Sequence, residues 1–135
     1  MAKIDWAGLT QDMERLLHLK AGPVAYKRLE RAEELDKIPG VMRLDRRASF
    51  CQVPAMVRTM GLTVGATRDN FGERCARING LAPTTEKQVA WEAESFANTW
   101  FANVAEARKQ MAAYPVVPAG EALVLSPLAA GKFEP

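Results

Sequence analysis

Two cysteines and a run of arginines are the residues of this chain whose types could do chemistry. Cys51 and Cys75 both lie in the segment 46–81, together with six arginines. They do not have the spacing of a CxxC pair, and His18 is the single histidine. Since a structural zinc site takes four Cys or His ligands, one chain alone cannot fill it. We therefore expect Cys51 and Cys75 to ligate zinc or an iron–sulfur cluster only with ligands from a second chain.

Two other roles for the cysteines remain open. A cysteine away from any metal behaves as a small hydrophobic side chain, so both could be core residues. Cys51 also follows Arg46 and Arg47 and lies near the predicted start of a helix, and both features favour a thiolate. A reactive thiol at Cys51 is therefore the third interpretation.

The arginines indicate an anionic ligand. Guanidinium groups bind carboxylates and phosphates through two parallel hydrogen bonds, and a helix N-terminus adds backbone N–H donors. A helix that begins at Ser49, directly after Arg46 and Arg47, would combine the two. The expected ligand is an acyl-CoA, a nucleotide or a carboxylate, and the candidate anion-binding residues are Arg46, Arg47, Ser49, Arg74 and Arg77. The alternative is a solvated basic face that pairs with nearby acids or with an acidic partner.

The chain offers no recognisable catalytic set. His18 lies among leucines near the end of the first predicted helix, where an imidazolium suits the helix dipole. The stretch GATRDNFGE at 65–73 matches neither GxGxxG nor GxxxxGK(S/T), so it does not indicate a phosphate loop. A net charge of +2 without a known binding motif argues against nucleic acid as a partner. The catalytic residues stay unknown, and the sequence leaves open whether the protein is an enzyme.

Hydrophobic spacing predicts the elements that must position these residues. Apolar residues at helical spacing predict a helix over 5–19, ended by Gly22-Pro23. Alternation predicts a strand over 24–30, and the polar stretch 31–47 is typical of a short helical turn followed by a surface loop. The next predicted elements are a helix over 49–60 with Ser49 as N-cap and Gly61 as stop, a strand over 62–67 and a turn.

The second half of the chain is predicted to contain one long amphipathic helix and one interior strand. Thr85 and Gln88 form a capping box, and an apolar stripe continues from there, so we expect the helix near 85–113. The stretch 121–128 is apolar nearly throughout, which is typical of a buried strand. These elements together predict an α/β or α+β fold, a small mixed sheet with packed helices.

Length and composition bound the class of protein. With 135 residues, 48% of them hydrophobic and 25% charged, the chain is expected to form a single domain over 1–135. Its N-terminus lacks the apolar run of a signal peptide, and no window reaches the ~20 apolar residues of a membrane span. Two cysteines without a signal peptide fit the reduced cytoplasm, which is the predicted location, and no membrane partner is expected.

Several segments follow one another in a particular order. They are GPVAYKRL near the start, a Cys-Gln pair at Cys51, Cys75 after it, and then MAAYPVVPAGEALVLSPL and FEP. This order resembles the domain of unknown function 169 (DUF169) family of bacteria and archaea, over nearly the whole chain. Family members often carry a glycine-rich run after the second cysteine, where this chain has 76–80. They also usually continue beyond the FEP at which this chain stops.

That resemblance implies a domain whose sheet is completed by a partner chain or by a second copy, unless the chain is a truncated or short variant. An unfinished sheet would otherwise leave an open edge. We therefore expect a homo- or hetero-oligomeric accessory or subunit domain that binds an anionic small molecule or a redox or metal centre; the resemblance implies anaerobic metabolism as its context. The alternatives are a catalytic subunit of a multi-chain oxidoreductase or aromatic- or acyl-modifying enzyme, and a structural interaction domain with core cysteines.

Overall fold

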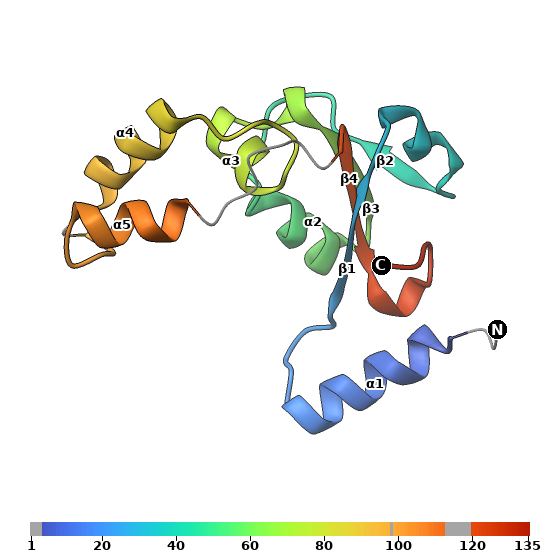
Figure 1. Ribbon diagram of the computed structural model, residues 1–135. Coiled ribbons are helices and arrows are strands. Elements are labelled where there is room, and N and C mark those ends of the chain that lie inside the picture. Colours follow the sequence, from blue (N-terminus) through green and yellow to red (C-terminus); the bar gives the residue numbers. More distant parts are fainter. Residues whose placement is uncertain (1–3, 98, 113–119) are drawn as a thin grey trace.

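A four-stranded mixed sheet forms the centre of the computed structural model, which describes residues 4–97, 99–112 and 120–135 (Figure 1). The strand order is β1-β4-β3-β2. β4 pairs antiparallel with both of its neighbours, whereas β2 pairs parallel with β3. The mixed class predicted from the sequence is confirmed. The strands are β1 (Val24–Leu29), β2 (Val41–Arg43), β3 (Thr63–Thr67) and β4 (Ala122–Pro127).

β4 is central because its side chains are apolar on both faces of the sheet. Leu123 and Leu125 belong to the hydrophobic cluster under α2 (Gln52–Met60). Val124 belongs to the cluster on the opposite face, under the 3-10 helix η1 (Ala32–Lys37). Alternate side chains of a strand point to opposite faces, so one apolar run serves both clusters. The predicted interior strand is confirmed.

The first helix, α1 (Trp6–Leu17), is present as predicted. The Asp5 carboxylate caps its start, because it accepts a hydrogen bond from the Gly8 N–H at 3.0 Å. His18, with φ 50°, ends it. The helix contacts mainly the 3-10 helix η3 (Leu128–Ala130), and in Figure 1 it lies below the sheet. Much of its surface is therefore exposed.

The polar stretch 31–47 contains more regular structure than the sequence predicts. η1 is the short helical turn expected there. β2, however, lies where the sequence indicates a surface loop. Its three residues pair with β3, which is distant along the chain, and no local pattern shows such a pairing. The helix α3 (Glu73–Ile78), after the short 3-10 helix η2 (Arg68–Asn70), is likewise not predicted.

The single long helix predicted near 85–113 is wrong. The structure has two helices, α4 (Glu86–Phe96) and α5 (Val104–Met111), which fold back on each other as a hairpin at one end of the molecule (Figure 1). The capping box at the start of α4 is confirmed. Residue 113, the predicted end, lies outside the described residues.

The break between the two helices has a local and a tertiary cause. Asn103 caps α5, because its side-chain oxygen accepts a hydrogen bond from the Glu106 N–H at 3.0 Å. Ala93 of α4 then packs with Ala107 and Met111 of α5 in a small core. The hairpin thus buries part of the apolar stripe, whereas Trp100 and Val104 of the same stripe stay exposed. No helix among the described residues is long and apolar enough to cross a membrane.

Candidate functional site

An open groove lies between the outer face of α2 and the segment 42–48, which contains the end of β2 and the loop after it. Its volume is about 1090 Å³. The segment contributes three arginines, Arg43, Arg46 and Arg47, whereas α2 contributes mainly apolar and neutral side chains. Basic and apolar groups therefore share one surface.

α2 forms the apolar wall because its two faces differ. Val53 and Val57 are buried in the core beneath the helix. Met56 and Met60, which recur at the same four-residue spacing on another side, line the groove. Gly61 ends the helix with φ 67°, in the left-handed region that glycine adopts without steric cost, as the sequence predicts.

The loop that carries Arg46 and Arg47 is fixed at both ends. The Leu44 N–H donates to a β3 carbonyl at 2.9 Å, which continues the pairing of β2 with β3. The Ala48 N–H donates to the Asn70 carbonyl at 2.8 Å, and the Asn70 side-chain amide donates to the Leu44 carbonyl at 3.0 Å. A loop backbone ordered in advance loses less conformational entropy when a ligand binds.

Arg46 and Arg47 are the exposed, unengaged cations of the groove. Neither forms an ion pair or a side-chain hydrogen bond with any other residue that the structure describes. Arg43 differs, because it donates to Asp36 Oδ1 at 2.7 Å and to the Ala32 carbonyl at 3.3 Å. Two guanidinium groups can thus still bind the oxygens of an anion.

Ser49 lies beside the groove but does not line it. Its N–H donates to Gln52 Oε1 at 2.8 Å, and its carbonyl accepts the Gln52 N–H at 3.0 Å. The prediction of Ser49 as N-cap is wrong. Since a backbone turn from Ser49 to Gln52 precedes the helix, the N-cap is Cys51, which makes no side-chain capping bond.

The two cysteines lie in different surroundings. Cys51 is exposed at the start of α2, whereas Cys75 on α3 is half-buried and packs against the cluster under α2. Across the described ranges, no three side chains of His, Cys, Asp or Glu come together as a metal site. His18 ends α1. A metal or cluster bound by these cysteines would therefore still require ligands from a second chain.

Arg74 and Arg77 belong to a separate charge cluster between α3 and α4. Arg77 is buried and forms an ion pair with Glu92, which is buried as well. Arg74 Nε lies 3.9 Å from Glu92 Oε2. The Arg74 guanidinium also lies over the rings of Phe96 and Trp100, at 4.1 and 5.7 Å from their centres. The five residues predicted to bind an anion are thus not gathered in one place.

Two features of these sites have no counterpart among the sequence predictions. Glu92 has the pattern of a surface carboxylate, but the structure buries it against Arg77 of α3. Met56 and Met60 could have been found, because they recur four residues apart on a different side from Val53 and Val57. That spacing indicates a second, apolar face on α2.

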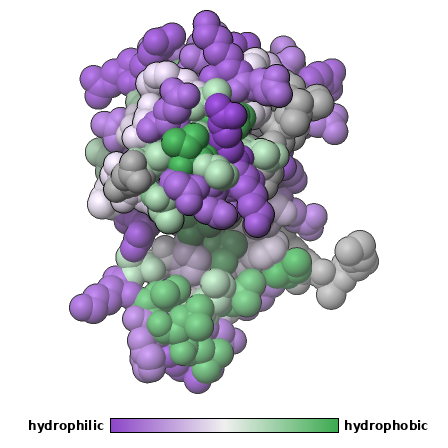
Figure 2. Space-filling view, turned by 60° about the vertical axis from the view of Figure 1, so that its left-hand side comes forward, coloured by the Kyte–Doolittle hydropathy of each residue, from purple (hydrophilic) through white to green (hydrophobic). Residues whose placement is uncertain are grey.

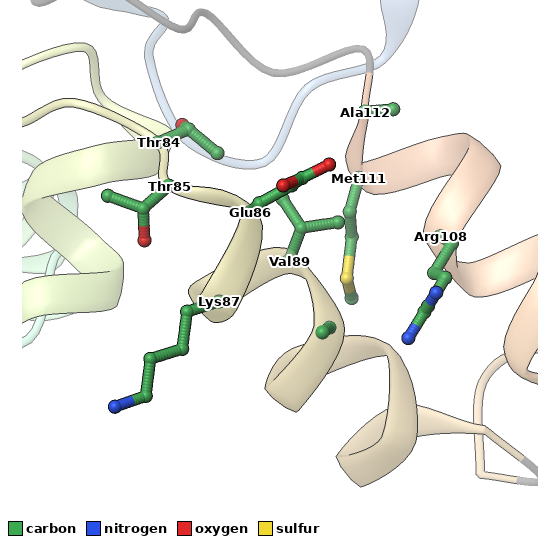
Figure 3. Close-up of a pocket in the computed structure, with 9 residues that line it drawn as sticks. Thr84, Thr85, Glu86, Lys87, Val89, Arg108, Met111 and Ala112 are labelled. Carbon is green, nitrogen blue, oxygen red and sulfur yellow. The ribbon is translucent and has the colours of Figure 1, made fainter.

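A second hollow, of about 640 Å³, lies in the helical hairpin between the start of α4 and the end of α5 (Figure 3). Val89 and Met111 approach each other in it, whereas the Lys87 side chain points away. Glu86 and Arg108, of opposite charge, both line it. The groove beside α2, with its two unengaged arginines, is the stronger candidate for an anion.

Comparison with known proteins shows similarity over nearly the whole chain. A family model described as DUF169, Uncharacterised ArCR, COG2043, matches residues 12–135. The match begins inside α1 and includes the groove, the charge cluster and all four strands. No curated protein and no solved structure matches the chain.

Proposed function

The chain belongs to the DUF169 family, and on that premise we propose that it is an accessory or subunit domain that binds a small anionic molecule in the groove beside α2. The ligand is an acyl-CoA, a nucleotide or a carboxylate, and Arg46 and Arg47 bind its anionic group. One observation carries the proposal: two exposed arginines lie on a loop fixed at both ends, next to an apolar wall.

A ligand with an anionic group and an apolar body uses both parts of this groove. The guanidinium groups bind phosphate or carboxylate oxygens in pairs, and the flexible thioethers of Met56 and Met60 adapt to an apolar chain. Among the three classes, an acyl-CoA engages the most of this surface. Asp45 also lines the groove. Its charge reduces the attraction of the two arginines for an anion. Because Arg46 and Arg47 are exposed, salt screens the attraction that remains, so we expect an affinity that falls as salt is added.

Thermal unfolding with added CoA, butyryl-CoA, ATP or butyrate tests the proposal. A ligand that binds only the folded state raises Tm. Arg46→Ala with Arg47→Ala should abolish the rise, and the matching pair of lysine substitutions should restore only part of it, because lysine lacks the planar fork. Arg58→Ala is the control, since Arg58 is an exposed arginine of α2 that does not line this groove. The proposal is wrong if none of the four compounds raises Tm, or if Arg58→Ala abolishes the rise equally.

A second candidate function is a redox or metal centre that uses Cys51. The observation that favours it is the exposure of Cys51 at the start of α2, where a second chain can reach the thiol. Protein prepared without oxygen should then contain iron or zinc in a complex of two or more chains, and Cys51→Ser should remove the metal. If the protein contains no metal and binds none of the anions, two hypotheses remain: a structural interaction domain, or a catalytic subunit that depends on another chain. In each case the reduced cytoplasm is the compartment we propose.

A further inference from the structure

The backbone that carries Arg46 and Arg47 sets these two arginines apart from other exposed charges. Hydrophilic residues cover much of the visible face of the main body in Figure 2, so an exposed arginine alone does not indicate a site. Among the described residues, the backbone of 45–47 forms no hydrogen bond. The shape of this loop therefore depends on Leu44 and Ala48 at its two ends.

Asn70, which is distant along the chain, bonds to both ends of the loop. Its backbone carbonyl accepts the Ala48 N–H at 2.8 Å, and its side-chain Nδ2 donates to the Leu44 carbonyl at 3.0 Å. The Leu44 N–H also donates to the Gly65 carbonyl of β3 at 2.9 Å, and Ala48 forms a parallel bridge with Phe71. A single residue thus fixes the separation of positions 44 and 48.

The side-chain amide of Asn70 is itself held in one orientation. Its Oδ1 accepts the Thr67 N–H at 2.8 Å and the Thr67 hydroxyl at 3.1 Å. A backbone N–H can only donate and a carbonyl can only accept, so Oδ1 faces Thr67 while Nδ2 faces Leu44. The next residue, Phe71, is buried in the hydrophobic cluster under α2. Asn70 therefore connects the loop to the core.

We propose that Asn70 positions Arg46 and Arg47 for an anion, an inference that rests on the function proposed above. Asn70 does not line the groove, so it acts through the loop backbone and not through contact with the ligand. When the backbone is already fixed, only the arginine side chains lose conformational freedom as the anion binds. The affinity of the groove should therefore depend on a residue that does not touch the ligand.

Limited digestion of the whole protein with trypsin tests the order of the loop without any ligand. Trypsin cleaves after arginine, and the rate of cleavage follows the population in which the local chain is open. Asn70→Ala removes the side-chain bonds to Leu44 and Thr67. Cleavage after Arg46 and Arg47, located by mass spectrometry, should become about tenfold faster.

Asn79→Ala is the matched control. The Asn79 side chain also donates to a backbone carbonyl, that of Cys75, at 2.8 Å, but it does not line the groove. This variant should leave the cleavage of the loop unchanged. Asn70→Ser is a second test variant, because its hydroxyl is too short to reach the Leu44 carbonyl, and it should also be cleaved faster. Circular dichroism checks that all three variants fold.

The affinity for butyryl-CoA, measured by titration calorimetry well below the Tm of every variant, tests the effect on binding. Asn70→Ala should raise Kd about fivefold, because part of the binding energy must then order the loop. Asn79→Ala should leave Kd unchanged, which separates positioning from a general loss of stability.

Three results would overturn the positioning role. They are equal cleavage of the loop in the wild type and both Asn70 variants, equally faster cleavage in Asn79→Ala, and an unchanged Kd in Asn70→Ala. The anion site itself would stand in each of these cases. A wild-type protein that binds neither butyryl-CoA nor the other three compounds would instead overturn the proposed function, and the positioning role with it.

Discussion

Arg77 and Glu92 carry opposite charges with side chains that are 1% and 4% exposed. Removing a charge from water costs several kcal/mol, and the ion pair offsets that cost only while both partners are present. Arg74, 3.9 Å from the same carboxylate, adds a second positive charge. This cluster joins α3 to α4, so these residues position the hairpin on the rest of the molecule.

Removing one partner of this pair should cost far more stability than removing both. Glu92→Gln leaves the buried guanidinium of Arg77 without its carboxylate, and we expect a loss of about 3–5 kcal/mol in the free energy of unfolding. Arg77→Met combined with Glu92→Leu should lose much less, because no buried charge is left unpaired. Urea denaturation of the three proteins measures the difference. A Glu92→Gln variant as stable as the wild type would show that the pair is solvated.

Tyr26 should link stability to alkaline pH. Burial raises the pKa of Tyr26 above its usual 10.0, and the nearby charge of Arg28 lowers it by a smaller amount. The unfolded state therefore ionises first. The contribution of the neutral Tyr26 side chain to the free energy of unfolding is therefore complete below about pH 10, and it is lost as the pH rises through the pKa of the folded state. Tyr26→Phe keeps the ring that packs edge-on against Phe50. It should remove the part of the alkaline loss of stability that the ionisation of Tyr26 causes.

The measurement for Tyr26 is the free energy of unfolding of wild type and Tyr26→Phe at about pH 9 and about pH 11. The wild type should lose more stability between these two values than the variant does. Equal losses in the two proteins would show that other groups, such as lysines, cause the whole alkaline effect.

At the scale of elements, η1 and β3 approach so closely that only glycine fits at position 65. A Cβ on Gly65 would lie 2.6 Å from Leu35 Cδ2 and 2.9 Å from Val41 Cγ2. Leu35 is fully buried, so it has little room to move. Gly65→Ala should therefore destabilise the protein by about 1–3 kcal/mol, measured by thermal or urea unfolding. Gly72→Ala is the control, because a Cβ there meets no atom within 4 Å; equal effects of the two changes would contradict the packing argument.

At the scale of the whole molecule, the sheet and the hairpin should differ in stability. β3 and β4 lie in the middle of the sheet with hydrophobic clusters on both faces. α4 and α5 pack mainly on each other, and polar contacts with α3, such as those of Arg77 with Glu92 and of Gln88 with Glu73, join them to the rest. Elements with few buried apolar contacts to the main core open more easily.

Amide hydrogen exchange followed by mass spectrometry or NMR measures this difference directly. The amides of α4 and α5 should exchange at least about tenfold faster than those of β3 and β4, because a local opening of the hairpin leaves the sheet intact. Exchange of both regions at one common rate would show instead that the hairpin and the sheet unfold as a single cooperative unit.

The part of the site that could be predicted from the sequence is the part that depends on near neighbours. Arg46 and Arg47 lie close before a helix, and both line the groove. Their role in anion binding stays a prediction. Arg74 and Arg77 have the same residue type and a similar density of charge, but α3 turns them toward Glu92. Residue type alone does not reveal which partner a guanidinium meets.

The sequence by itself determined the elements whose signals are local: α1, β1, the Gly61 end of α2, the Thr85 capping box and the apolar β4. Only the tertiary structure decided the rest. It placed β2 against β3, folded the stripe of α4 and α5 into a hairpin and buried Glu92. The physical reason is range: caps and periodicity act within a few residues, whereas strand pairing and the burial of charge depend on segments that meet only when the whole chain is folded.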